Sequence, residues 1–68
     1  MGGIQNKVAL FRKKFGITQG ELAERIGVSR QTVVAIEKGN YTPSLLLGFI
    51  IAKFFGKKVE EVFELSDK

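Results

Sequence analysis

The stretch TQGELAERIGVSRQTVVAIEKG, residues 18–39, decides the expected fold of this 68-residue chain. Thr18 and Glu21 match the Thr-x-x-Glu capping box that starts a helix, because each side chain can satisfy a free backbone N–H of the other residue. Ser29 is a second favourable N-cap and predicts that another helix begins directly after it. Only a Gly-Val dipeptide separates the two helical patterns, which is too short for an ordinary loop. This spacing predicts a helix-turn-helix over residues 18–38, in which the first helix braces the second for insertion into the DNA major groove.

Three further helices are expected, one before this motif and two after it. Apolar residues at helical spacing predict the first of them and are Ile4, Val8, Phe11 and Phe15. Thr42 followed by Pro43 is typical of a helix start, with threonine as the N-cap and proline as the first helical residue. The last, short helix would carry Val59, Val62 and Phe63. No stretch shows strand-like alternation, so the sequence predicts a single all-α domain of five helices over residues 1–68.

Glycines mark the expected helix ends. Glycine suits the left-handed residue that follows a helix, and it stands after four of the helical patterns, at Gly16, Gly27, Gly39 and Gly56. Two more glycines, Gly20 and Gly48, fall inside expected helices, where each costs about 1 kcal/mol relative to alanine. Either a close approach of another backbone or chance would explain these two.

The composition limits the chemistry that this chain can perform. It contains no cysteine and no histidine, which excludes disulfide bonds and the usual zinc sites, and no acidic cluster has metal-ligand spacing. It offers no constellation for nucleophilic or acid–base catalysis, so we expect neither an enzyme nor a cofactor. No signal peptide is visible, and the longest apolar stretch, residues 45–52, is far shorter than the roughly 20 residues that span a membrane. We therefore expect a cytoplasmic, nucleoid-associated protein without a membrane contact.

The charges are divided unevenly along the chain. Residues 1–40 hold seven basic and three acidic side chains, whereas residues 41–68 hold four of each. A basic part joined to a neutral and more apolar part suits a nucleic-acid-binding face backed by an association face. A merely soluble basic protein would show the same totals, so charge alone does not decide between the two.

The second helix of the motif begins with the polar residues Ser29, Arg30, Gln31 and Thr32. The first turn of a recognition helix reaches the base edges, where arginine pairs with guanine and glutamine with adenine. Val34 and Ala35 lie off the core face formed by Val33 and Ile36 and could meet thymine methyl groups. Gln19 stands at the start of the first helix of the motif, beside free backbone N–H groups that favour an anion such as phosphate. An ordinary solvated helix face is the alternative for each residue taken singly.

The chain also resembles the Cro and phage-repressor type of helix-turn-helix protein, the XRE family of bacterial and archaeal regulators. The resemblance runs over about residues 6–65 and rests on Thr18-Gln19-x-Glu21-Leu22-Ala23, Gly27-Val28-Ser29-Arg30-Gln31-Thr32-Val33, Ile36-Glu37-x-Gly39 and Pro43-Ser44-Leu45. It implies a lambda-repressor-like domain of five helices that binds double-stranded operator DNA. Such proteins usually bind as homodimers on a two-fold site, and most often they repress transcription.

The resemblance also implies roles for single residues. Gln19 would touch phosphate and steady the recognition helix, and the residues that approach bases would be Ser29, Arg30, Gln31 and Ala35. This chain has alanine at position 35, where relatives often carry a polar side chain. The alanine weighs against hydrogen-bonded readout at this position. Asn40 and Tyr41 lie in the loop that would contact the DNA backbone.

Glu37 closes a helix whose other face is expected to meet an anion. A carboxylate exposed to DNA would be repelled, so Glu37 needs a cation of its own. Arg12, near the end of the first helix, is the expected partner, and the resemblance also suggests this pairing. We therefore predict a structural ion pair between the two side chains.

Leu46 and Ile50 depart from the family pattern, because relatives commonly carry charged, outward-facing residues at these positions. One interpretation is a core helix that is simply very apolar. The other is an added apolar stripe for subunit association, since contiguous exposed apolar patches seldom go unused. On the second interpretation the homodimer interface comprises Leu46, Ile50, Phe54, Phe63 and Leu65. An antitoxin or adaptor whose apolar C-terminal half binds a different protein, such as a toxin, remains the alternative function.

Overall fold

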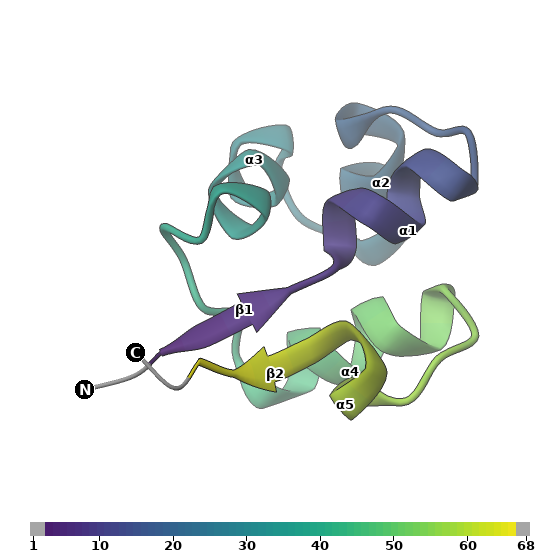
Figure 1. The fold of residues 1–68 in the computed structure, drawn as a ribbon. Helices are drawn as coiled ribbons and strands as arrows, with labels where there is room; N and C mark the ends of the chain where they lie inside the picture. The colour runs from purple at the N-terminus through teal and green to yellow at the C-terminus, as the bar shows by residue number, and fades with distance from the viewer. Residues whose placement is uncertain (1–2, 67–68) are drawn as a thin grey trace.

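The computed structural model describes residues 3–66 as a small, mainly helical domain (Figure 1). Its elements in chain order are β1 (Ile4–Asn6), α1 (Val8–Lys14), α2 (Gln19–Ile26), α3 (Arg30–Lys38), α4 (Leu45–Phe54), α5 (Val59–Val62) and β2 (Phe63–Leu65). Helices α1, α2 and α3 lie together in the upper part of Figure 1, and α4 and α5 lie below them. The two strands run side by side across the front and join the two groups of helices.

The strand pair corrects the expectation of an all-α domain. β1 and β2 are antiparallel, with Ile4 opposite Leu65 and Asn6 opposite Phe63. Ile4 therefore lies in a strand and not in the first helix, and Phe63 follows the last helix instead of belonging to it. Each strand has only three residues, too few for an alternation pattern. Their pairing depends on the meeting of the two ends of the chain, which local sequence does not reveal.

The capping box expected at the start of α2 is confirmed. The N–H of Glu21 donates to Thr18 Oγ1 at 3.0 Å, and the N–H of Thr18 donates to Glu21 Oε1 at 2.7 Å. The hydrogen bond that the Glu21 carboxylate accepts from the Thr18 N–H is the main cause that holds the pKa of Glu21 below its ordinary value. The left-handed Gly27, with φ of 79°, ends α2 and turns the chain directly into α3.

Two other helix starts differ from expectation. Helix α4 begins after Ser44, whose Oγ accepts a hydrogen bond from the N–H of Leu47 at 3.1 Å. The expected start at Thr42 and Pro43 is wrong, since both residues precede this cap. Serine is a more favourable N-cap than threonine, and Ser44 stands two residues further on. Helix α1 begins only at Val8, where the N–H is accepted by Asn6 Oδ1 at 3.1 Å.

One apolar core holds the helices together. Its buried side chains are Val8, Leu22, Ala23, Ile26, Val33, Ile36, Ile51, Ala52, Phe55 and Val62. Burying a large apolar side chain contributes about 1.5–3 kcal/mol, so these residues fix how α2 packs on α3 and on α4. No polar or charged residue of the range 3–66 is fully buried.

Of the two explanations for the helical glycines, a close approach of another backbone is not found. A β-carbon at Gly48 would lie 3.8 Å from Phe63 Cε2, and one at Gly20 would lie 3.9 Å from its nearest neighbours. Both distances are ordinary van der Waals contacts. An alanine would therefore fit at either position.

Candidate nucleic-acid interface

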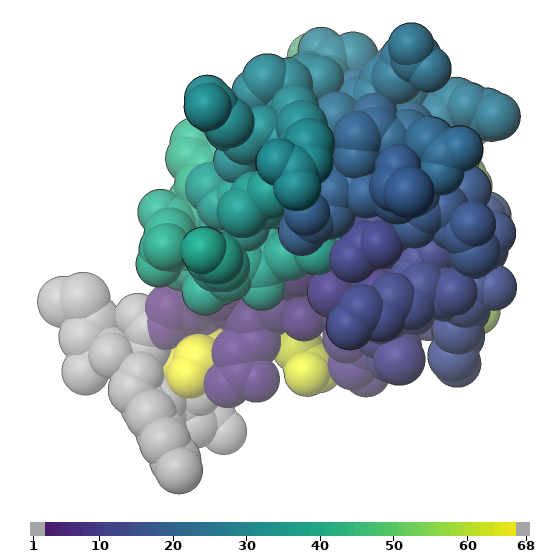
Figure 2. Space-filling view, turned by 90° about the horizontal axis from the view of Figure 1, so that it is seen from above, coloured from purple at the N-terminus to yellow at the C-terminus, as the bar shows by residue number. Residues whose placement is uncertain are grey.

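The first turn of α3 presents its polar side chains at the surface. Arg30 and Gln31 are exposed, whereas Val33 and Ile36 on the opposite side of the helix are buried. Figure 2 shows the face over α1, α2 and α3, where the surfaces of α2 and α3 adjoin. The buried side of α3 thus fixes the helix against α2, and the exposed first turn is left for a ligand.

The other expected base-contacting residues either cap α3 or are partly buried. Ser29 caps the helix, and its Oγ accepts a hydrogen bond from the N–H of Thr32 at 3.2 Å. The two hydroxyl oxygens, Ser29 Oγ and Thr32 Oγ1, also lie 3.0 Å apart in a hydrogen bond. Val34 and Ala35 are half-buried. Arg30 and Gln31 are therefore the long side chains best placed to reach outward from this turn.

The ion pair between Arg12 and Glu37 is confirmed. Arg12 Nε donates to Glu37 Oε2 at 2.6 Å, and Arg12 Nη2 donates to Glu37 Oε1 at 3.2 Å. Arg12 Nη1 also donates to the carbonyl oxygen of Ile17 at 2.9 Å. Only 12% of the Arg12 side chain and 7% of the Glu37 side chain are exposed. This fork-to-fork contact ties the end of α3 to α1 and to the loop before α2.

The pair shifts the titration of both residues. Burial by itself would raise the pKa of Glu37, but hydrogen bonds from Arg12 and Gln19 outweigh burial and leave that pKa below its ordinary value. The hydrogen bond to Glu37 in turn raises the pKa of Arg12. Glu37 is therefore an ionised carboxylate whose negative charge is compensated by Arg12, so it does not present an unpaired charge beside α3.

Gln19 links this ion pair to the first turn of α3. Gln19 Nε2 donates to Glu37 Oε1 at 2.9 Å, and Arg30 Nη2 makes a long contact of 3.5 Å with Gln19 Oε1. The sequence pointed to Gln19 only as a phosphate contact and as support for the recognition helix. Its bond to Glu37 was missed, because the two residues are 18 positions apart and belong to different helices.

The loop between α3 and α4 follows directly on the exposed face. The left-handed Gly39, with φ of 81°, ends α3, and the N–H of Asn40 closes the helix end on the carbonyl of Ala35 at 2.9 Å. Asn40 and Tyr41 are both exposed. Their position beside α3 is compatible with the expected contact to a DNA backbone.

Comparison with known proteins identifies the motif. Residues 8–62 match the helix-turn-helix family. The chain belongs to the helix-turn-helix family. A protein of Methanocaldococcus jannaschii named as an HTH-type transcriptional regulator is 53% identical over 64 residues, which cover 94% of this chain and 97% of that protein. The transcriptional repressor RstR of the cryptic phage CTXphi of Vibrio cholerae is 34% identical over 62 residues, covering 91% of this chain and 56% of the repressor.

A crystal structure of a hypothetical transcription factor, NHTF, from Neisseria has a similar fold. It superposes with a TM-score of 0.74 at 29% identity, over 81% of this chain and 63% of that chain. The expected Cro- and phage-repressor-type family is thus confirmed. The names of these relatives are those of transcriptional regulators and not of enzymes, in agreement with the expectation from composition.

The helix-turn-helix domain carries a second surface feature on α4. Among the residues expected at a dimer interface, Leu46 is 71% exposed, Ile50 39% and Leu65 82%. Phe54 and Phe63 are instead half-buried and pack against the domain's own core. Two residues of this face were missed from the sequence, namely Leu45 and Phe49, which are 74% and 56% exposed. We call Leu45, Leu46, Phe49 and Ile50 the α4 apolar face.

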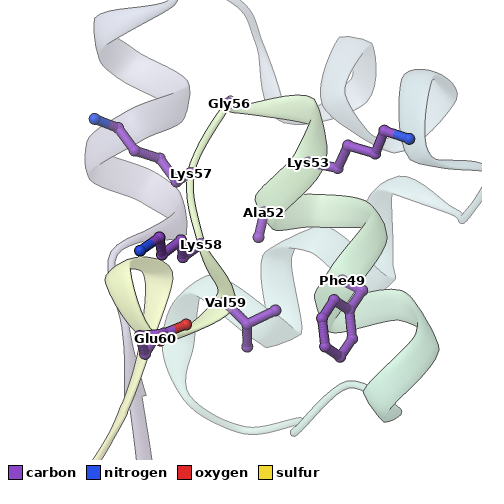
Figure 3. A pocket seen from close by; sticks show the side chains of 8 residues that line it. All are labelled: Phe49, Ala52, Lys53, Gly56, Lys57, Lys58, Val59 and Glu60. Atoms are coloured by element: carbon purple, nitrogen blue, oxygen red, sulfur yellow. The ribbon is translucent and has the colours of Figure 1, made fainter.

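A shallow pocket of about 420 Å³ adjoins this face. Its lining residues are Phe49, Ala52, Lys53, Gly56, Lys57, Lys58, Val59 and Glu60. Figure 3 shows Phe49 and Val59 on facing sides of the pocket, with Lys53 and Lys57 extending away on opposite sides. The pocket therefore has apolar walls and a rim that carries three lysines and Glu60.

Two other features, a metal-binding cluster and a membrane-spanning helix, are absent from the part of the chain that the structure describes. No three His, Cys, Asp or Glu side chains between residues 3 and 66 come together as metal ligands. None of the helices in this range is long and apolar enough to cross a membrane.

Proposed function

We propose that this protein is a sequence-specific regulator of transcription that binds double-stranded DNA with α3 in the major groove. The observation that carries the proposal is the exposed first turn of α3, where Arg30 and Gln31 project from a helix whose opposite side is buried against α2. This is the arrangement that a recognition helix requires, because its N-terminal residues meet the base edges. Such a protein acts in the cytoplasm, at the nucleoid.

The side chains of α3 suggest how bases are read. Arg30 can donate two hydrogen bonds to guanine, and Gln31 can pair with adenine in the same way. Val34 and Ala35 are placed further along the helix, where small apolar groups suit thymine methyl groups. Gln19, Asn40 and Tyr41 flank the helix and are proposed to contact phosphates. Ser29 and Thr32 contribute mainly by fixing the start of α3, because their hydroxyl groups already bond to each other.

We further propose that the protein represses transcription. Support comes from the family membership and from the phage repressor RstR among the relatives. A small domain bound across a promoter would exclude polymerase from the same DNA. Repression then depends on occupancy of the operator and needs no catalytic group.

The proposed active form is a homodimer joined through the α4 apolar face. A domain of this size has a marginal core of its own, so covering exposed Leu45, Leu46 and Phe49 would add stability. The lysines at the rim of the adjoining pocket complement acidic residues of a second copy, which are Glu60, Glu61 and Glu64. Two copies related by a two-fold axis would also match a two-fold operator.

A titration of labelled duplex DNA at several salt concentrations tests DNA binding. Each phosphate neutralised by the protein contributes about 0.9 to the slope of log affinity against log salt. We expect a steep slope for the wild type and a weaker affinity for Arg30→Ala on a cognate site. Lys58→Ala, on the other side of the domain, is the matched control and should retain wild-type affinity for a single half-site. A slope indistinguishable from zero would contradict the proposal.

Sedimentation of Leu46→Glu/Ile50→Lys tests the homodimer. We expect the wild type to be dimeric at tens of micromolar and the double variant to be monomeric, because a glutamate and a lysine would have to be desolvated in an apolar interface. Lys13→Glu, which also changes a surface charge but lies on α1, should stay dimeric. A monomeric wild type would contradict the homodimer. The α4 apolar face would then point to the alternative function, an antitoxin or adaptor that binds a different protein.

A further inference from the structure

Gln19 has a side-chain amide with two chemically different ends, and the structure uses both. Its Nε2 donates to Glu37 Oε1 at 2.9 Å, and its Oε1 faces Arg30 Nη2 at 3.5 Å. An amide nitrogen can only donate and an amide oxygen can only accept. The orientation of the amide therefore decides whether Arg30 meets an acceptor or a second donor.

Glu37 is the group that sets this orientation. A carboxylate only accepts hydrogen bonds, and the contacts of 2.6 and 3.2 Å from Arg12 leave Glu37 Oε1 able to accept from Gln19 as well. Gln19 must therefore turn its nitrogen toward Glu37, which leaves its oxygen directed at Arg30. Because 7% of the Glu37 side chain is exposed, water competes little for this carboxylate.

We infer that Glu37 is a positioning residue for base reading, which acts through Gln19 to hold the Arg30 guanidinium in the orientation that pairs with guanine. This inference rests on the proposed function, since it assigns the source of specificity at the same interface. The contact between Gln19 and Arg30 is long and exposed in the free protein. Bound DNA excludes water from the interface, and the contact strengthens as the local dielectric constant falls.

Glu37→Gln is the decisive variant because it keeps the shape of the side chain and changes one end of it. Arg12 would take the single amide oxygen of the new glutamine, and the amide nitrogen would then face Gln19. Gln19 would have to present its oxygen to that nitrogen and turn its own nitrogen toward Arg30. Two donors would then oppose each other, and Arg30 would lose its support.

The measurement is the ratio of dissociation constants for two duplexes that differ at one base pair. That pair is the one whose guanine preference disappears in Arg30→Ala. For the wild type we expect a preference of about 5- to 150-fold for guanine there. Glu37→Gln should lower this ratio by about threefold or more, a coupling typical of residues in one hydrogen-bond network. Preferences at the other base pairs should remain unchanged.

Two further variants separate positioning from a merely structural role. Arg12→Met breaks the same ion pair and lowers stability, but Glu37 still accepts from Gln19, so the guanine ratio should stay within about twofold of wild type. Gln19→Leu should lower the ratio as much as Glu37→Gln does. Adding Glu37→Gln to Gln19→Leu should lower it no further. Circular dichroism confirms that each variant is folded at the assay temperature.

An unchanged guanine ratio in Glu37→Gln, or an equal loss in Arg12→Met, overturns the inference and leaves the proposed function intact. If Glu37→Gln does not fold, Gln19→Leu decides alone, and a uniform weakening for all duplexes overturns the inference. A wild type without any preference that depends on Arg30 contradicts the proposed base reading itself, and the inference with it.

Discussion

The surface of α2 and α3 and the surface of α4 are built on opposite principles. At the first, polar side chains from three helices bond to one another. Arg12 contacts Glu37, Glu37 contacts Gln19, and Gln19 contacts Arg30. At the second, four large apolar side chains, Leu45, Leu46, Phe49 and Ile50, are exposed side by side on one helix. The charge follows the same division, with an excess of four basic residues in positions 1–40 and none in positions 41–68.

This difference fits the two kinds of partner that we propose, DNA and a second copy of the chain. Reading bases requires donors and acceptors held in fixed directions, which the hydrogen-bond network supplies. Association through apolar area needs no such directions and tolerates small shifts between the partners. The polar network is therefore expected to be sensitive to the exchange of a single donor or acceptor atom. The α4 apolar face should tolerate small changes in side-chain shape.

The largest effect on stability is expected from Arg12→Met. The variant leaves the nearly buried Glu37 carboxylate without its cation, and breaking such a pair costs about 2–4 kcal/mol. Lys13→Met, at the next position on the exposed side of α1, should change stability by no more than about 0.5 kcal/mol. Chemical denaturation monitored by circular dichroism measures both. Equal midpoints for the two variants would show that the ion pair contributes nothing beyond a surface charge.

Base discrimination should respond next. Arg30→Ala is expected to lose about 1–3 kcal/mol at one base pair of the cognate site, and Gln31→Ala a similar amount at another pair. Neither variant should unfold the domain, because both side chains are exposed. Competition binding with single-base variants of the site provides the measurement. A uniform loss across all variants would assign both residues to phosphate contacts.

Low pH should lower the stability of the domain through protonation of Glu37. The folded-state pKa of Glu37 lies below its ordinary value of 4.5, so the unfolded chain takes up a proton first as the pH falls. The contribution of Glu37 to stability is therefore complete above that value and is lost as the pH drops through the lowered pKa. Denaturation midpoints between about pH 6 and about pH 3 should fall less in Glu37→Gln than in the wild type. A parallel fall in both proteins would show that protonation of Glu37 does not cause the loss of stability at low pH.

The smallest expected effect is a gain, and it concerns the apolar half. Gly48→Ala should stabilise the domain by about 0.5–1 kcal/mol, because alanine favours helix α4 and its methyl group meets Phe63 at an ordinary contact distance. Gly39→Ala is the contrasting variant, since φ of 81° strains any residue with a side chain. Thermal unfolding should move in opposite directions for the two. A destabilised Gly48→Ala would show that α4 has less space than the contact distance indicates.

The success of sequence-based prediction followed the range of the interaction in most places, although the local prediction of a helix start at Thr42 was wrong. The capping box at Thr18 and the turn at Gly27 were predicted correctly because they depend on residues within a few positions. Contacts between distant segments were harder to predict. The pairing of β1 with β2 joins opposite ends of the chain, and the bond from Gln19 to Glu37 joins two helices. The pairing of Arg12 with Glu37 was predicted at long range, because a carboxylate beside an anion-binding face needs a cation and the family resemblance also suggested Arg12.

Selection of bound duplexes from a random library, carried out with the wild type and with Arg30→Ala, tests the central claim most directly. The account predicts that the wild type enriches a two-fold symmetric site whose half-sites lie about 34–36 Å apart. It also predicts one guanine in each half-site that Arg30→Ala no longer selects. A library without any enriched sequence, or the same enriched site for both proteins, would contradict base reading by α3.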